Sequence, residues 1–257
     1  MSILGRRGII SSGAFRGTVV PEAVQKFDAS DITTMFTDAG TTQVTTDLDK
    51  VYQFDSAIGS DSALQTIESQ RPVYRTNVQN GLSALEFTSS NTQHLDIDKP
   101  SFFSSVSDTT WVIVWKAKSS TRAILYANLD STTGTGNWYL IYDVPTNTMK
   151  FEYYESGWNS ISVYTPLDTN VVHVTTLRTV GTLVSVYHDG VLAGTYTLTT
   201  TTNFDNANTG GFRLGINGSS DVLPFDGYIF ENRIWSQGLS SEQLEQLWLD
   251  LDTKYGL

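Results

Sequence analysis

Apolar and polar residues alternate in short runs over most of the chain from Asn80 onward. In the run 93–98, Leu95 and Ile97 fall on one face of a strand, and His94 with its acidic neighbours falls on the other. Further runs of this kind are 110–116, 123–127, 138–143, 149–154, 160–164, 171–178, 183–188, 191–198, 211–216 and 225–235. So many short segments, separated by turn residues, predict an all-β fold of two packed antiparallel sheets.

Two local signals mark the ends of elements. Asp189-Gly190 stands between alternating runs and predicts a two-residue hairpin turn, in which both residues need positive φ. Near the C-terminus, Ser240 and Gln243 have the spacing of a capping box, and apolar residues follow at helical spacing, namely Leu244, Leu247, Trp248 and Leu251. The pattern predicts one helix over 241–254, packed on the outside of the sheets.

The first 26 residues differ from the rest of the chain in charge. They carry a net charge of +3, whereas residues 27–257 carry −14. Glycines interrupt this opening, and no hydrophobic period persists across it. We therefore expect an extended basic N-terminal arm over 1–26 and one domain over 27–257, with a frayed terminus without a role as the alternative. The arginines of the arm are Arg6, Arg7 and Arg16.

Composition narrows the function classes. The chain has 257 residues, a net charge of −11, 39% hydrophobic residues and 12% aromatic residues, which is too apolar for a disordered acidic protein. Its negative charge disfavours nucleic acid as a partner, because phosphate contacts need basic surfaces. The absence of cysteine excludes disulfides and thiolate nucleophiles. We read neither a membrane-spanning segment nor a signal peptide from the sequence.

Several short motifs typical of one protein family occur between Arg71 and Leu257. They are Arg71-Pro72, Asn80-Gly81, Leu85-Glu86-Phe87, Val172-His173-Val174, Val186-Tyr187-His188-Asp189-Gly190, Leu214-Gly215-Ile216, Phe225-Asp226-Gly227-Tyr228-Ile229, Ile234-Trp235, Leu239-Ser240-Ser241-Glu242-Gln243-Leu244 and Lys254-Tyr255-Gly256-Leu257. As a set, they resemble the concanavalin A-like lectin/glucanase superfamily, specifically its laminin-G-like jelly rolls in bacterial and phage proteins. The resemblance implies a two-sheet antiparallel jelly-roll sandwich over 27–257. It leaves the ligand open, because the superfamily includes lectins, glycosidases, adhesion modules and virion proteins.

Patterns for catalysis and metal binding are weak. The glucanase branch carries Glu-x-Asp-x-x-Glu on one strand, and because no such stretch occurs here we expect no enzyme and name no catalytic residue. We expect His173 to be a packed strand residue and His188 to begin the hairpin turn. Family members often hold calcium at the sandwich rim, so a rim calcium is the alternative to having no cofactor. The loop residues of suitable type are Asp130, Asn217 and Asp221.

Two tryptophan–asparagine pairs are candidates for glycan binding. Asn137-Trp138 and Trp158-Asn159 each put an aromatic ring beside a planar amide in a loop-like stretch. The alternative is that Trp138 opens a core strand and Trp158 packs over a hairpin. We assign the strand and helix tryptophans to the core, namely Trp111, Trp115, Trp235 and Trp248.

Two functions fit these observations. The first is a non-enzymatic phage virion protein, a capsid decoration, fibre or tail-surface component at the virion surface, in which the arm attaches the jelly roll to other virion proteins and favours homo-oligomers. The alternative is an extracellular carbohydrate-binding or adhesion module of bacterial origin that binds host-surface glycans. A glycoside hydrolase is a remote third.

Overall fold

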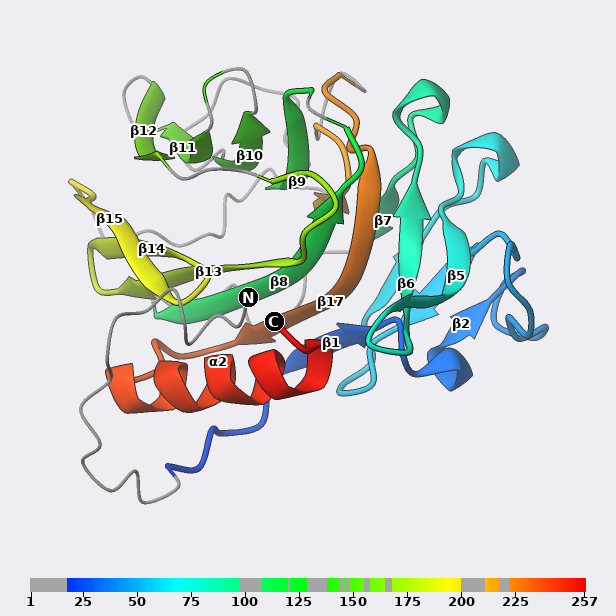
Figure 1. The fold of residues 1–257 in the computed structure, drawn as a ribbon, viewed down its shortest axis with the longest axis horizontal. Helices are drawn as coiled ribbons and strands as arrows, with labels where there is room; N and C mark the ends of the chain where they lie inside the picture. Colours follow the sequence, from blue (N-terminus) through cyan, green and yellow to red (C-terminus); the bar gives the residue numbers. More distant parts are fainter. Residues whose placement is uncertain are drawn as a thin grey trace.

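The computed structural model describes residues 18–97, 108–119, 121–128, 138–143, 146, 148–154, 158–164, 168–199, 211–217 and 222–257. Within these residues the chain forms two antiparallel sheets packed face to face, and one α-helix, α2 (Ser241–Tyr255), lies outside them (Figure 1). This arrangement confirms the all-β jelly-roll sandwich expected from the sequence. In the same residues, no helix is long and apolar enough to cross a membrane.

Sheet A contains eight of the described strands. In order across the sheet they are β15 (Val191–Thr197), β14 (Leu183–His188), β13 (His173–Val180), β8 (Thr109–Ala117), β17 (Gly227–Trp235), β6 (Leu82–Phe87) and β5 (Val73–Gln79), with β1 (Gln25–Asp28) also paired to β17. The long strands β8 and β17 form the middle of the sheet, with Trp111 opposite Ile234. Strands β14 and β15 form the predicted hairpin, in which Asp189 and Gly190 both have positive φ.

Sheet B contains nine of the described strands. Their order is β12 (Trp158–Tyr164), β11 (Thr148–Tyr154), β10 (Trp138–Asp143), β9 (Ala123–Asn128), β16 (Phe212–Leu214), β7 (Leu95–Ile97), β4 (Ser62–Leu64), β3 (Gln53–Asp55) and β2 (Met35–Phe36). Short 3-10 helices lie between strands, at Ile32–Thr34, Glu68–Gln70 and Ser89–Asn91. The edge strands β12 of sheet B and β15 of sheet A are in contact, with the Ile161 side chain against Gly194.

Aromatic side chains fill the core between the inner faces of the sheets. Trp111 of sheet A meets Trp138 of sheet B edge to face, with ring centroids 4.8 Å apart, and Tyr126 stacks on Trp138 at 5.6 Å. Edge-to-face aromatic pairs contribute about 0.5–1.5 kcal/mol beyond their burial. The four tryptophans assigned to the core by sequence are all at most 5% exposed, which confirms their assignment.

Helix α2 begins and ends as its sequence predicts. The Ser240 hydroxyl accepts from the backbone N–H of Gln243, whose side chain accepts from the Ser240 N–H, and Gly256 ends the helix at φ 65°. The apolar side of α2 packs on the outer face of sheet A, where Trp248 donates its indole N–H to Thr176 at 3.1 Å. This contact makes a second apolar layer outside the sandwich.

The predicted boundary at 26/27 is wrong, because it falls inside β1. Gln25 pairs with Ile234 in register, and its side chain is fully buried. Before the strand, the carbonyl oxygen of Pro21 accepts a 2.8 Å hydrogen bond from the buried indole of Trp235. The basic, glycine-rich composition of the first residues predicts an extended arm, and the short strand β1 was missed because it forms only by pairing with β17. The sandwich therefore includes the chain from at least Pro21 onward.

A buried ion-pair network joins β1, β17 and α2. Lys254 Nζ lies 2.6 Å from Asp28 Oδ2 and 2.9 Å from Glu231 Oε2, and the Tyr255 hydroxyl donates to Glu231 at 2.9 Å. Burial alone would raise the pKa of Asp28, but Lys254, Ser30 and Lys26 stabilise its carboxylate and lower the pKa to about 2. The network fixes the C-terminal turn of α2 against the first strand.

Candidate functional site

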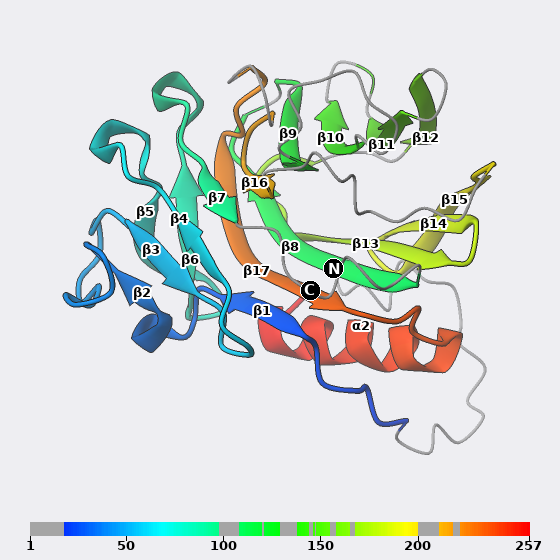
Figure 2. The same cartoon turned by 180° about the vertical axis from the view of Figure 1, so that it is seen from behind.

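One of the two outward sheet faces is covered by a helix. Val112, Val114 and Val174 of sheet A pack in one apolar cluster with α2. In Figures 1 and 2, α2 lies on the side of the molecule away from β9–β12. The outer face of β10–β12 in sheet B is therefore a sheet surface that the helix leaves uncovered.

The pairing register identifies the side chains on this uncovered face. Glu152 of β11 pairs with Tyr139 of β10 and with Ser160 of β12, and residues paired in this way point to the same side of a sheet. Ser160 is exposed, whereas Tyr139 and Glu152 are half-buried. Two positions along β11, Lys150 lies on the same face by the alternation of strand residues.

Charged groups of both signs lie together here. Arg122 is 3.6 Å from Glu152 and 3.9 Å from Asp143, and Lys150 is 3.2 Å from Asp143. We call Arg122, Tyr139, Asp143, Lys150 and Glu152 the β11 patch. The Arg122–Glu152 pair is partly exposed, and such pairs contribute only about 0–1 kcal/mol to stability, so these two groups can exchange partners with a ligand at small cost. The buried Asp143 carboxylate holds Arg122 and Lys150 in place. Carboxylates that accept and cations that donate, next to a tyrosine ring, suit a ligand rich in hydroxyl groups.

Trp138 does not have the exposed position that a glycan platform needs. It opens β10 as a core residue, only 1% exposed, with its ring against those of Trp111 and Tyr126. The alternative interpretation of this residue is the one that the structure supports. Its neighbour Asn137 lies outside the described residues.

The second tryptophan–asparagine pair lies on β12, the strand next to β11. Trp158 begins β12 and pairs with Tyr154 at the end of β11. The side chain of Trp158 lies outside the described part of the structure, so its role in binding stays a prediction. Asn159 is half-buried and pairs with the core residue Tyr153.

The other predicted site residues are mostly outside the described ranges. This holds for the arm residues Arg6, Arg7 and Arg16 and for the rim residues Asp130 and Asp221. Asn217 is described, and its carbonyl oxygen lies 3.5 Å from an Arg213 guanidinium nitrogen, shortly after β16. A rim calcium site therefore stays an expectation.

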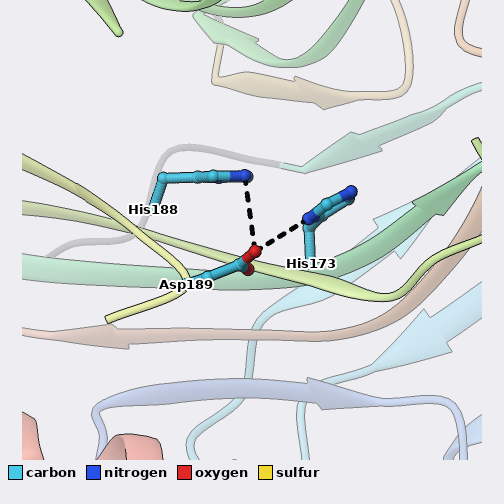
Figure 3. A group of neighbouring side chains, drawn as sticks. All are labelled: His173, His188 and Asp189. Atoms are coloured by element: carbon cyan, nitrogen blue, oxygen red, sulfur yellow. Dashed lines mark hydrogen bonds and ion pairs between the residues drawn. The ribbon is translucent and has the colours of Figure 1, made fainter. Parts of the chain in front are cut away.

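A buried cluster of His173, His188 and Asp189 lies at one end of sheet A (Figure 3). His173 Nδ1 is 3.0 Å from Asp189 Oδ2, and His188 Nε2 is 3.6 Å from the same oxygen. The three residues are 5% exposed or less. Both imidazole rings thus converge on one carboxylate oxygen inside the protein.

Neighbouring groups orient each member of this cluster. The backbone N–H of Val174 donates to Asp189 Oδ1 at 2.9 Å, His173 Nε2 lies 3.2 Å from the Asp168 carbonyl oxygen, and His188 Nδ1 lies 3.3 Å from Thr175 Oγ1. Burial alone would raise the pKa of Asp189, but His188, His173 and the Val174 N–H lower it to about 2. The carboxylate is therefore ionised at neutral pH.

Sequence reasoning placed each member of the cluster but did not bring them together. It took His173 as a packed strand residue, which the structure confirms, and used Asp189 only as a turn residue. The signal was available in the β13–β14 pair, because antiparallel pairing counted from the turn at Gly181 and Thr182 puts His188 opposite Thr175, two residues from His173.

Comparisons with known proteins agree on the fold. A family model described as the concanavalin A-like lectin/glucanases superfamily matches residues 89–245. No curated protein sequence matches the chain. Domain 4 of AbnA, a GH43 extracellular arabinanase from Geobacillus stearothermophilus, in complex with arabinotriose, has 16% identity and a TM-score of 0.60, and the match covers 88% of this chain and 98% of that one.

A second solved structure shares part of the fold. The NanB sialidase from Streptococcus pneumoniae has 14% identity and a TM-score of 0.53, and the match covers 63% of this chain but 26% of that one. At these identities, the likeness of both structures to this chain establishes the sandwich fold.

Proposed function

Because the chain belongs to the concanavalin A-like lectin/glucanase superfamily, we propose that it is a non-catalytic carbohydrate-binding module whose ligand lies on the outer face of β10–β12. The observation that carries the proposal is the β11 patch, where acids, cations and a tyrosine share a sheet face that the helix leaves uncovered. The arabinotriose-bound arabinanase domain, whose match covers 88% of this chain, supports the choice of ligand class.

The patch gives each group a role in binding. Glu152 accepts hydrogen bonds from sugar hydroxyls, and Lys150 donates to ring or hydroxyl oxygens. Tyr139, which packs against the apolar cluster containing Ile141, offers its ring edge and hydroxyl group to the sugar. We propose that Trp158 extends this surface, since it pairs with Tyr154 at the end of β11, whereas Asn159 pairs with the core residue Tyr153 and so belongs to the inner face of the sheet.

The first function predicted from the sequence, a phage virion protein attached through a basic arm, has less support. None of the comparisons described above involves a virion protein, and the arginines of the arm lie outside the described residues. The carbohydrate-binding alternative agrees better with the family and with the arabinotriose-bound domain.

Titration calorimetry with arabinotriose, followed by a panel of neutral and sialylated oligosaccharides, tests the proposal. We expect Glu152→Gln to weaken binding about tenfold or more, because a hydrogen bond to a charged group contributes about 1.5–3 kcal/mol. Glu68→Gln is the matched control, because Glu68 also pairs with a single cation, Lys50 at 3.1 Å, but lies in the 3-10 helix after β4. Its affinity should equal that of the unchanged protein.

Three outcomes would contradict parts of this proposal. If no oligosaccharide binds the folded protein, the carbohydrate class is wrong. If both glutamate variants bind equally well, the ligand lies elsewhere than the β11 patch. If new reducing ends appear during incubation, the module is a hydrolase. Trp158→Ala tests the extension of the surface separately, since it should weaken binding without lowering the melting temperature.

A further inference from the structure

The buried histidine–aspartate cluster holds a conflict among its hydrogen-bonding groups. Both ring nitrogens of His173 face oxygens, the Asp168 carbonyl at 3.2 Å and Asp189 Oδ2 at 3.0 Å. A carbonyl and an ionised carboxylate only accept, whereas a neutral imidazole has a single N–H. Neutral His173 would therefore turn a lone pair toward an oxygen. A cation between His173 and Asp189, either a second proton or a metal ion, removes the conflict.

The spacing of the three groups fits a metal ion. Ligand atoms from His173, His188 and Asp189 all lie within 4.8 Å of one another, and the two nitrogens are 3.0 and 3.6 Å from the shared carboxylate oxygen. In a tetrahedral zinc site with bonds of about 2.0–2.1 Å, neighbouring ligand atoms are about 3.3 Å apart. The two nitrogen–oxygen separations bracket this value, and the two nitrogens lie within 4.8 Å of each other, so side-chain shifts would complete three of four ligand positions.

The surroundings of the cluster also match those of metal sites. A metal-binding histidine usually donates its other N–H to a carbonyl or another acceptor, which fixes the ring and turns the ligand nitrogen toward the metal. The Asp168 carbonyl is placed to do this for His173, and the Thr175 hydroxyl is placed to do it for His188. The Val174 N–H holds the carboxylate through Oδ1, which leaves Oδ2 directed at both rings (Figure 3).

We propose that His173, His188 and Asp189 form a binding site for a divalent transition metal ion of the zinc type. Two imidazole nitrogens and one carboxylate oxygen are ligands that zinc prefers, whereas calcium prefers sites made entirely of oxygen. The site joins β13 to the turn after β14 and lies under the Trp115 ring, whose centroid is 5.1 Å from that of His173. A metal there would stabilise the end of sheet A, because folding assembles the three ligands.

The chain itself allows a clean experiment. It has three histidines and no cysteine, so zinc held through nitrogen in untagged protein is bound either at this cluster or at His94. His94 is equally buried, but it lies against Gln65 and the Thr92 carbonyl, outside the cluster. His188→Gln and His94→Gln are therefore matched variants, each removing one buried imidazole.

Untagged protein is unfolded, freed of metal with a chelator and refolded with one equivalent of zinc chloride, then dialysed and analysed for metal. We expect about one zinc per chain in the unchanged protein and in His94→Gln, and at least about a tenfold lower content in His188→Gln. Zinc should also raise the melting temperature of the unchanged protein. Any shift caused by calcium should be the same in the unchanged protein and in His188→Gln. Cobalt in place of zinc should give the visible absorption of a four-coordinate ion.

The unchanged protein alone decides the matter if His188→Gln does not fold. Refolding that leaves no zinc bound, with the same melting temperature with and without metal, would overturn the proposal. Zinc retained by His188→Gln but lost from His94→Gln would also overturn it.

Discussion

Gly190 determines how the β14–β15 hairpin can turn. It has φ 74°, and Asp189 before it has φ 47°, so both turn residues are in the left-handed region that suits the twist of a two-residue hairpin. Aspartate tolerates this region better than most residues, and glycine adopts it without strain. A β-branched side chain at position 190 would clash with its own backbone.

Gly190→Val should therefore destabilise the protein by about 1–3 kcal/mol. The measurement is the midpoint of urea denaturation, with Val191→Ala as the control at the next, 49% exposed position. Equal midpoints for the valine variant and the unchanged protein would show that the turn has another geometry.

At the residue scale, the sequence predicted backbone turns, caps and strand positions better than it predicted which side chains come into contact. Turn residues, the capping box and the four core tryptophans depend on local pattern, and the structure confirms them. Trp138 shows the limit, because a tryptophan after a threonine- and glycine-rich stretch has the same local sequence in a binding loop and in a core strand. Its burial depends on partners distant in sequence, such as Trp111 from the other sheet and Phe212 from β16.

At the scale of elements, α2 and β1 depend on each other through Asp28. The carboxylate of Asp28 is 6% exposed, and Lys254 from the last turn of α2 donates to it. Its pKa is about 2 in the fold, below the ordinary value of 3.8. Between these values the unfolded chain binds more protons than the folded one, so stability increases with pH. The contribution is complete above about pH 4 and is lost as the pH falls toward 2.

We expect this single group to contribute on the order of 2 kcal/mol to the pH dependence of unfolding between pH 4 and 2. Asp28→Asn should reduce the loss of stability over that interval, measured by urea denaturation at several pH values. The control is Asp250→Asn, at an exposed position of helix α2. If the two variants and the unchanged protein lose stability in parallel, Asp28 is not held as a buried ion pair.

The element that sequence reasoning missed is β1. Its four residues are too few for an alternating pattern, and the glycines and arginines before them indicate an extended arm. The strand forms because β17 offers it a partner, from Gln25 opposite Ile234 to Asp28 opposite Glu231. Such long-range pairing is absent from any local pattern, which is why the domain boundary was placed too late.

At the scale of the whole molecule, removal of the N-terminus in two lengths tests this boundary. Deleting residues 1–17 should leave the melting temperature unchanged. Deleting residues 1–28 should cost at least about 4 kcal/mol, because it removes the buried Phe27 ring and the Pro21 carbonyl that pairs with the Trp235 indole. Circular dichroism melting of both proteins is the measurement, and equal melting temperatures would show that β1 is dispensable.

The pairing of β1 with β17 also constrains how the protein can be made in a cell. The two strands are separated by about 200 residues, so at ~5–20 residues per second β1 leaves the ribosome about 10–40 s before its partner has been synthesised. During that interval β1, which contains Phe27, lacks its partner strand β17. Asp28 lacks the ion pair with Lys254 of α2. The first described strand to emerge is therefore among the last to find its partner in sheet A, and its pairing waits until translation is nearly complete.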